Sequence, residues 1–117
     1  MKQIKSSTWQ DFHIVALGYP DNPNDSQMRS TINFYIRTFK YKVPCGRCRI
    51  HYAEVINKIP IRADSKTNLF NWTVDIHNAI NKKLKKTLTD YDTAFTYWTS
   101  IKNSLIAEKL QYTNKKN

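Results

Sequence analysis

The chain has 117 residues, with 19 Lys and Arg against 9 Asp and Glu, so its formal net charge at pH 7 is +10. This length predicts a single domain over residues 1–117 with a core at about 7–110, large enough to fold without a disulfide framework. The charge excludes an acidic solvating segment and leaves nucleic acid, an anionic surface or a phosphorylated cofactor as classes of partner. Aromatic residues at 13%, with 2 Gly and 4 Pro, argue against disorder and against a β sandwich.

The N-terminal residues and the lengths of the apolar runs indicate in which cellular compartment the protein is expected. Residues 1–5 lack the apolar region of a signal peptide, and no stretch approaches the roughly 18 apolar residues of a membrane span. We therefore expect a soluble protein of a reducing compartment with no membrane partner. The polar ends at residues 1–5 and 112–117 are expected to be loose.

Apolar residues recur three and four positions apart along most of the chain, which predicts helices, and no pair of alternating strands competes with them. Prolines separate the segments, because proline removes a backbone donor and disfavours helix at the residue before it. Thr89 is expected to cap the last helix. The predicted fold is an all-α bundle with a short extra helix, its helices at about 7–19, 25–41, 45–59, 66–86 and 90–110.

Cys45 and Cys48 are the two cysteines, and Pro44 before them predicts that both lie in the first turn of the third helix. Backbone N–H groups and the helix macrodipole stabilise a thiolate there, and Arg47 and Arg49 add positive charge. Two cysteines three positions apart can close an exchangeable disulfide. A redox-active pair is the favoured interpretation, while an inert pair and a metal site stay open.

A zinc site would combine Cys45, Cys48 and His51, which fall within two helical turns. Zinc takes four tetrahedral ligands, so the distant His13 or His77 would have to complete the set. A single CxxC is a weak zinc signal, and a thioredoxin-like site would need a strand before the helix. We assign no metal ligand, and the alternative function is a small basic helical zinc protein that interacts with nucleic acid.

A second group of polar residues lies on the fourth predicted helix. At about 100° per residue, His77, Asn81 and Leu84 fall within a sector of roughly 60°, with Asn78 on its flank. Asn and His lower helix propensity and need partners when buried, so this stripe favours a site for a planar ligand rich in heteroatoms. For any one of these residues alone, a solvated or satisfied side chain is the simpler interpretation.

Lysines and aromatic residues complete the candidates. Residues 82–86 carry four lysines, which either complement the helix C-terminus or hold a pyrophosphate or nucleic acid. Trp9 and His13 lie four positions apart, and with Trp98 they are more typical of a core than of a ligand site. Basic charge is otherwise scattered and no nucleic-acid-binding motif is present, so nucleic acid is not an expected partner.

The combination is more specific than its parts: Trp9 with His13; Pro44-Cys45-Gly46-Arg47-Cys48 with His51-Tyr52; Trp72 with His77-Asn78 and Asn81; Lys86; Trp98. In this order and spacing, over about residues 7–98, the chain resembles the Erv/ALR family of FAD-linked sulfhydryl oxidases, particularly the minimal forms of large DNA viruses. The resemblance implies a four-helix bundle with a short fifth helix, holding FAD at one end.

The resemblance also implies an activity. The family oxidises dithiols to disulfides and passes the electrons through FAD to O2, giving hydrogen peroxide. By resemblance, Cys48 lies against the isoalloxazine and Cys45 is the cysteine that substrate thiolates attack. The residues that the resemblance assigns to FAD binding are Thr8, Trp9, His13, His51, His77, Asn78, Asn81, Lys83, Lys86 and Trp98.

The partners follow from the same resemblance. This chain has no second CxxC, so a protein dithiol, or a small shuttle protein with its own CxxC, is expected to reach Cys45 directly. A homodimer through the first two helices is expected. Its apolar area would come from Ile14, Leu17, Ile32 and Ile36. The resemblance to viral members favours the host cytoplasm or the virion over the mitochondrial intermembrane space.

Overall fold

The structure, a computed structural model, describes residues 6–116, with side chains described for residues 7–111. The described residues form helices and no strand, so the all-α prediction is confirmed. The α-helices are α1 (Ser6–Leu17), α2 (Asp25–Asn33), α3 (Gly46–Lys58), α4 (Lys66–Lys83) and α5 (Tyr91–Lys116), with a π-helix, η1 (Phe34–Thr38), and a 3-10 helix, η2 (Phe39–Lys42). Residues 1–5 and 117, expected to be loose, lie outside the described residues.

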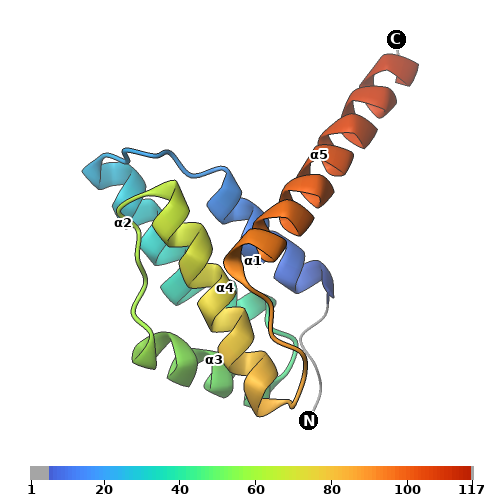
Figure 1. Cartoon of the computed structure of the whole chain (residues 1–117). Coiled ribbons are helices and arrows are strands. Elements are labelled where there is room, and N and C mark those ends of the chain that lie inside the picture. The colour runs from blue at the N-terminus through green and yellow to red at the C-terminus, as the bar shows by residue number, and fades with distance from the viewer. Residues whose placement is uncertain (1–5, 117) are drawn as a thin grey trace.

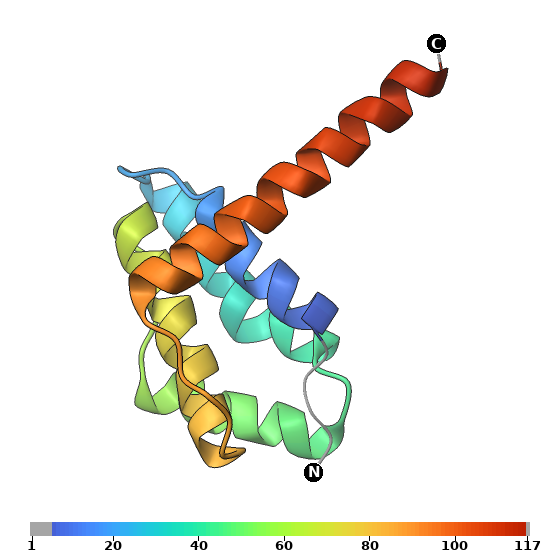
Figure 2. The same cartoon turned by 45° about the vertical axis from the view of Figure 1, so that its right-hand side comes forward.

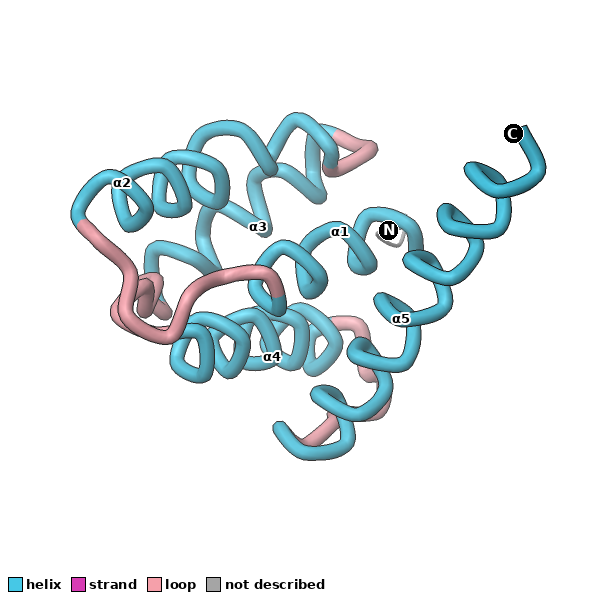
Figure 3. Tube along the Cα trace, turned by 90° about the horizontal axis from the view of Figure 1, so that it is seen from above, coloured by secondary structure: helices cyan, strands magenta, loops and turns pink. Residues whose placement is uncertain are grey.

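Helix α1 lies in the middle of the bundle. It packs against α4, which also packs against α3, while α2, η1 and η2 form the opposite wall (Figures 1 and 3). Helix α5 crosses α1 and α4 and then runs out beyond the bundle (Figure 2). None of the helices within residues 6–116 combines the length and apolar character that a bilayer crossing requires.

Helix α5 corrects the prediction of a short fifth helix. It is 26 residues long and continues to Lys116, through most of the end that was expected to be loose. The segment contains no Gly or Pro, and its second half is rich in Leu, Ala, Glu, Lys and Gln, which have high helix propensity. Nothing in the sequence therefore ends the helix earlier.

The second predicted helix, 25–41, is not continuous. Helix α2 ends at Asn33, and in η1 the Phe39 N–H bonds to the carbonyl of Phe34, five residues back. The carbonyl of Tyr35 instead accepts the hydroxyl of Tyr52 at 2.7 Å. The Tyr52 hydroxyl of α3 thus bonds to a backbone carbonyl where the regular α-helical hydrogen bonding is interrupted. A tertiary contact therefore determines where the second helix stops being α-helical.

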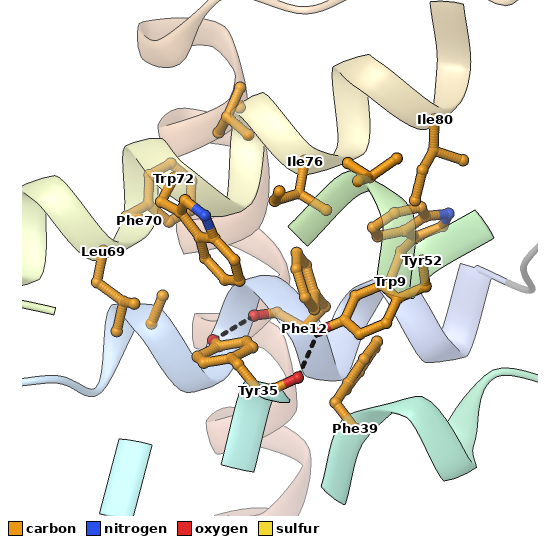
Figure 4. Packing of buried hydrophobic residues seen from close by; sticks show 14 of the residues in the cluster. Trp9, Phe12, Tyr35, Phe39, Tyr52, Leu69, Phe70, Trp72, Ile76 and Ile80 are labelled. Atoms are coloured by element: carbon orange, nitrogen blue, oxygen red, sulfur yellow. Dashed lines mark hydrogen bonds between the residues drawn. The ribbon is translucent and has the colours of Figure 1, made fainter. Parts of the chain in front are cut away.

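The core is mainly aromatic, with fully buried Phe12 at its centre (Figure 4). The Phe12 ring centroid lies 5.1 Å from that of Tyr35 and 5.7 Å from that of Trp72. Polar tips of the buried rings bond to backbone: Tyr35 Oη donates to Phe12 O at 2.7 Å and Trp72 Nε1 to Ile59 O at 2.8 Å. Burial therefore leaves these donors satisfied, and the core holds α1, η1, α3 and α4 in fixed register.

The predicted apolar faces are largely confirmed, with one correction. The residues that the helical spacing places on one side of the first and fourth predicted helices are buried, except Leu84, which is half-buried: Trp9, Phe12, Ala16, Tyr19, Leu69, Thr73, Ile76 and Ile80. Leu17, expected in a dimer face, is 4% exposed within the chain's own core. It lies on the same side of α1 as that core, so it cannot contribute area to a partner.

The junction between α4 and α5 corrects two boundaries. Helix α4 ends at Lys83 rather than at residue 86: Lys85 has a positive φ of 57°, and Lys86 N–H bonds to Asn81 O at 2.8 Å. This is a Schellman ending, in which a left-handed residue stops the helix. Thr89 is not the cap of α5, because the carboxylate of Asp90 accepts the Thr93 N–H at 2.7 Å.

Candidate functional site

The disulfide lies at the beginning of α3. Cys45 is the N-cap residue, its Sγ accepts the N–H of Cys48 at 3.2 Å, and the two sulfurs are bonded to each other. Cys45 is half-buried, whereas Cys48 is 4% exposed. A thiolate from outside can therefore reach Cys45, while Cys48 faces the interior, which is the division of roles expected for an exchangeable pair.

The zinc alternative loses its ligands in this arrangement. Cys45 and Cys48 are bonded to each other and offer no thiolate to a metal. His13 and His77 bond to each other instead. Within residues 6–116, no group of three or more His, Cys, Asp and Glu side chains is arranged to hold a metal ion.

A pocket of about 290 Å³ opens where α1, α4, α5 and the α4–α5 loop meet. Five of the predicted cofactor-binding residues line it: His13, His77, Asn78, Asn81 and Trp98. The remaining wall is formed by Val74, Thr89, Thr93, Ala94 and Tyr97. Residues up to 85 positions apart in the sequence thus line one concave pocket.

Four rings from three helices are layered at this pocket. The Trp9 and His77 rings stack with centroids 3.7 Å apart and planes 9° apart. The His13 and Trp98 rings stack at 4.7 Å and 24°. Parallel ring faces of this kind suit a planar aromatic ligand, which gains both apolar burial and stacking.

A chain of hydrogen bonds assigns the histidine tautomers. Thr73 Oγ1 donates its single proton to Phe70 O at 2.6 Å. It therefore accepts a hydrogen bond from His13 Nδ1, which lies 2.9 Å away. A neutral His13 then carries its proton on Nδ1 and accepts at Nε2, which lies 2.8 Å from His77 Nδ1. His77 is therefore the Nδ1–H tautomer, which leaves its Nε2 as an acceptor at the pocket for an amino or hydroxyl group.

Burial keeps both imidazoles neutral. It lowers the pKa of His77 to about 4, assisted by the positive charge of Lys86. Burial, followed by the repulsion of His77, holds the pKa of His13 well below its usual range. Two neutral imidazoles are what the tautomer assignment requires at physiological pH.

These pKa shifts predict that the folded protein loses stability as the pH falls. Between pH 6.5 and about 4 the unfolded chain binds protons that folded His77 does not, so the free energy of unfolding falls as pH falls through this window. Between pH 7 and pH 5, His77 alone should account for a loss of about 2 kcal/mol. Urea unfolding at pH 7, 6 and 5 measures it, and a His77→Gln variant should show a flatter profile. Equal stability of the parent protein at pH 7 and pH 5 would contradict the assignment.

Asn78 has a role that the sequence did not reveal. Its Nδ2 donates to Thr89 O at 2.7 Å, and its Oδ1 accepts the Thr89 N–H at 3.0 Å. Asn81 Nδ2 lies 3.5 Å from Thr87 O. These amides brace the α4–α5 loop, which forms one wall of the pocket, so Asn78 acts here on the chain itself.

The other predicted cofactor residues do not line the pocket. Thr8 Oγ1 lies 3.5 Å from Lys42 O, and Trp9 stacks behind His77. His51 is one turn after Cys48, and its pKa is lowered by burial and then by Lys83. Lys83 is exposed at the end of α4, and Lys86 is exposed in the α4–α5 loop.

Sequence reasoning missed three of the residues that matter at this site. Thr73 is not among the predicted site residues, and its fully buried hydroxyl requires a hydrogen-bond partner. Thr93 and Tyr97 line the pocket because of where α5 crosses the bundle. No local pattern specifies that crossing.

A sequence profile of the Erv1/Alr family matches residues 6–99, which contain the disulfide, the four layered rings and the pocket. The chain belongs to the Erv1/Alr family. Beyond residue 99, the outer half of α5 lies outside the family match.

Individual relatives agree with this membership. The chain is 40% identical over 89 residues to a probable FAD-linked sulfhydryl oxidase of Acanthamoeba polyphaga mimivirus, covering 74% of this chain and 62% of that protein. It is 32% identical over 89 residues to the FAD-linked sulfhydryl oxidase ERV2 of Saccharomyces cerevisiae, covering 76% of this chain and 45% of that protein. The chain thus spans less than two thirds of either relative.

A solved structure confirms the fold. The FAD-binding domain of Erv1 from Saccharomyces cerevisiae superposes on this Erv1/Alr chain with a TM-score of 0.74 and 30% sequence identity, covering 80% of this chain and 89% of that domain. The chain therefore shares its fold with that domain over about four fifths of its length.

Proposed function

We propose that this chain is an FAD-dependent thiol oxidase that converts protein dithiols to disulfides and reduces O2 to hydrogen peroxide. The observation that carries the proposal is the Cys45–Cys48 disulfide at the N-terminus of α3, with one sulfur accessible and the other buried. The names of the relatives support the same activity.

The residues at the pocket suit FAD. A volume of about 290 Å³ accommodates one ring system, and the half-buried rings of His77 and Trp98 line the pocket where adenine could stack. The acceptor at His77 Nε2 matches an amino group or a ribose hydroxyl. Lys83 at the end of α4 and Lys86 in the α4–α5 loop are exposed and supply positive charge for a pyrophosphate. The donor set therefore fits the group.

The protein's own chemistry is thiol–disulfide exchange. A substrate thiolate attacks Cys45 Sγ, the Cys45–Cys48 bond breaks, and Cys48 leaves as a thiolate stabilised by the α3 N-terminus. The second substrate thiolate then attacks the mixed disulfide, so that Cys45 leaves. The substrate loses two electrons and two protons, the cysteine pair gains the electrons, and the protons pass to solvent or to the new thiols. The chemistry that bound FAD supplies is acceptance of an electron pair and its transfer to O2.

The absorption spectrum and oxygen uptake of the purified protein test this function. We expect a yellow protein with flavin absorption bands that shift on denaturation, and peroxide formation coupled to dithiothreitol oxidation. A colourless protein that binds no added FAD and consumes no O2 with dithiothreitol would contradict the proposal. Zinc in elemental analysis would favour the alternative.

We also infer a homodimer through α1 and α2. Ile32 of α2 and Ile36 of η1 are 39% and 36% exposed, and they line one surface together with Arg29, Asn33 and Arg37. Ile14 of α1 is half-buried. The molecular mass in solution, from sedimentation velocity, tests the dimer. The viral origin of the mimivirus relative supports placement in a host cytoplasm or virion.

A further inference from the structure

The chain segment around the half-buried Cys45 carries only positive charge. Residues 40–49 contain Lys40, Lys42, Arg47 and Arg49 and no Asp or Glu. At about 3.6 Å per residue, every one of these Cα atoms lies within about 18 Å of Cys45. A substrate that reaches Cys45 therefore comes near this group of cations, which we call the basic rim.

Little of this charge is neutralised within the chain. Lys42 pairs with Asp11 at 3.3 Å, but both side chains are about half exposed, at 45% and 50%, and such surface pairs are weak. Arg49 Nε donates to the carbonyl of Val43 at 3.0 Å, which leaves its charge in place. Within the described part of the chain, no carboxylate pairs with Arg47. The basic rim is thus available to an external anion.

Exposed apolar side chains flank the same sulfur. Tyr41 and Ile50 are 71% and 63% exposed, more than any of the other exposed large apolar side chains described. Lys40 Nζ lies 5.2 Å from the Tyr41 ring centroid, so a cation of the rim contacts one of them. Arg47 and Ile50 are three positions apart on α3 and share a face. Apolar anchors beside a charged rim are the composition of a docking surface.

We propose that residues 40–50 form the docking surface for an acidic substrate, a protein whose dithiol is flanked by Asp or Glu and an apolar residue. The proposal rests on the thiol oxidase function and names the substrate class for it. Opposite charges steer the substrate toward Cys45 and raise the rate of encounter, whereas a basic dithiol protein is repelled. The apolar side chains then lengthen the encounter during exchange.

Two synthetic peptides test the charge preference. Each carries one CxxC and one Leu, flanked by four Asp in the first peptide and by four Lys in the second. In low salt, kcat/KM for the acidic peptide should exceed that for the basic peptide by about tenfold or more, and the ratio should fall as ionic strength rises. Each rate is divided by the rate of dithiothreitol oxidation under the same conditions. Equal normalised rates for both peptides in low salt would overturn the proposal.

Charge-reversal variants test which residues cause the preference for the acidic peptide. Arg47→Glu should reduce the acidic-to-basic ratio several-fold. Lys109→Glu, on the exposed outer part of α5, changes net charge equally and should leave the ratio nearly unchanged. Tyr41→Ser should raise KM for both peptides alike, because it removes apolar contact without changing charge. An equal effect of the two charge-reversal variants would assign the preference to net charge and overturn the docking surface. Absence of dithiothreitol oxidation in the parent protein would contradict the oxidase function instead.

Discussion

Replacing Cys48 by serine is expected to reduce dithiol oxidation to the background rate. A hydroxyl cannot form or break the bond with Cys45, so the electron pair of the substrate has no acceptor in the chain. Cys45→Ser is expected to abolish turnover equally, for a different reason: the remaining Cys48 is 4% exposed and out of reach of a protein thiolate. Oxygen uptake with a reduced protein dithiol as substrate measures both losses.

Thiol reactivity separates the two variants. In Cys48→Ser the half-buried Cys45 should react with a thiol reagent at least about tenfold faster than Cys48 does in Cys45→Ser, because access to the sulfur differs. Closing so short a loop contributes at most about 2 kcal/mol in the chain-entropy description, so both variants should stay helical by circular dichroism. Turnover of Cys48→Ser near the parent rate, or faster labelling of Cys48, would contradict the assigned roles.

Thr73→Val is expected to destabilise the protein and weaken the flavin site, although Thr73 touches no ligand. The substitution removes the acceptor of His13 Nδ1 and leaves a buried donor unpaired, at a cost of about 1–3 kcal/mol. His13 can then place its proton on Nε2, so that His77 turns its own acceptor toward His13 and presents a donor to the pocket. Urea unfolding measures the first effect, and the FAD dissociation constant the second.

Thr73→Ser is the matched control, because it keeps the hydroxyl that bonds to His13 and Phe70. It should retain FAD affinity far better than Thr73→Val. Nitrogen-15 chemical shifts of the imidazoles give a readout that a merely structural role would not move. Unprotonated Nε2 of His77 is expected in the parent protein, and a protonated Nε2 there would contradict the chain of hydrogen bonds.

Helix content and the reactive pair could be predicted from sequence because both are local. Apolar spacing of three and four residues identified the helices, and Pro44 before Cys45 located the beginning of α3 to within one residue. Their boundaries depended on tertiary contact. The Tyr52 hydroxyl interrupts the second helix at η1, and Lys85 takes a left-handed conformation that sequence patterns assign to Gly or Asn.

The sequence by itself determined the chemistry of this protein: the spacing of two cysteines, the stripe of His77 and Asn81, and the helical periodicity that turns both inward. Only the tertiary structure decided which of these side chains meet at the pocket and in which protonation state. The crossing of α5 over α1 brings Trp98 to His13, and the hydroxyl of Thr73 sets, through His13, which nitrogen of His77 carries the proton. Local propensities act over a few residues, whereas these contacts join positions 60 to 85 apart, so they exist only once the core has packed.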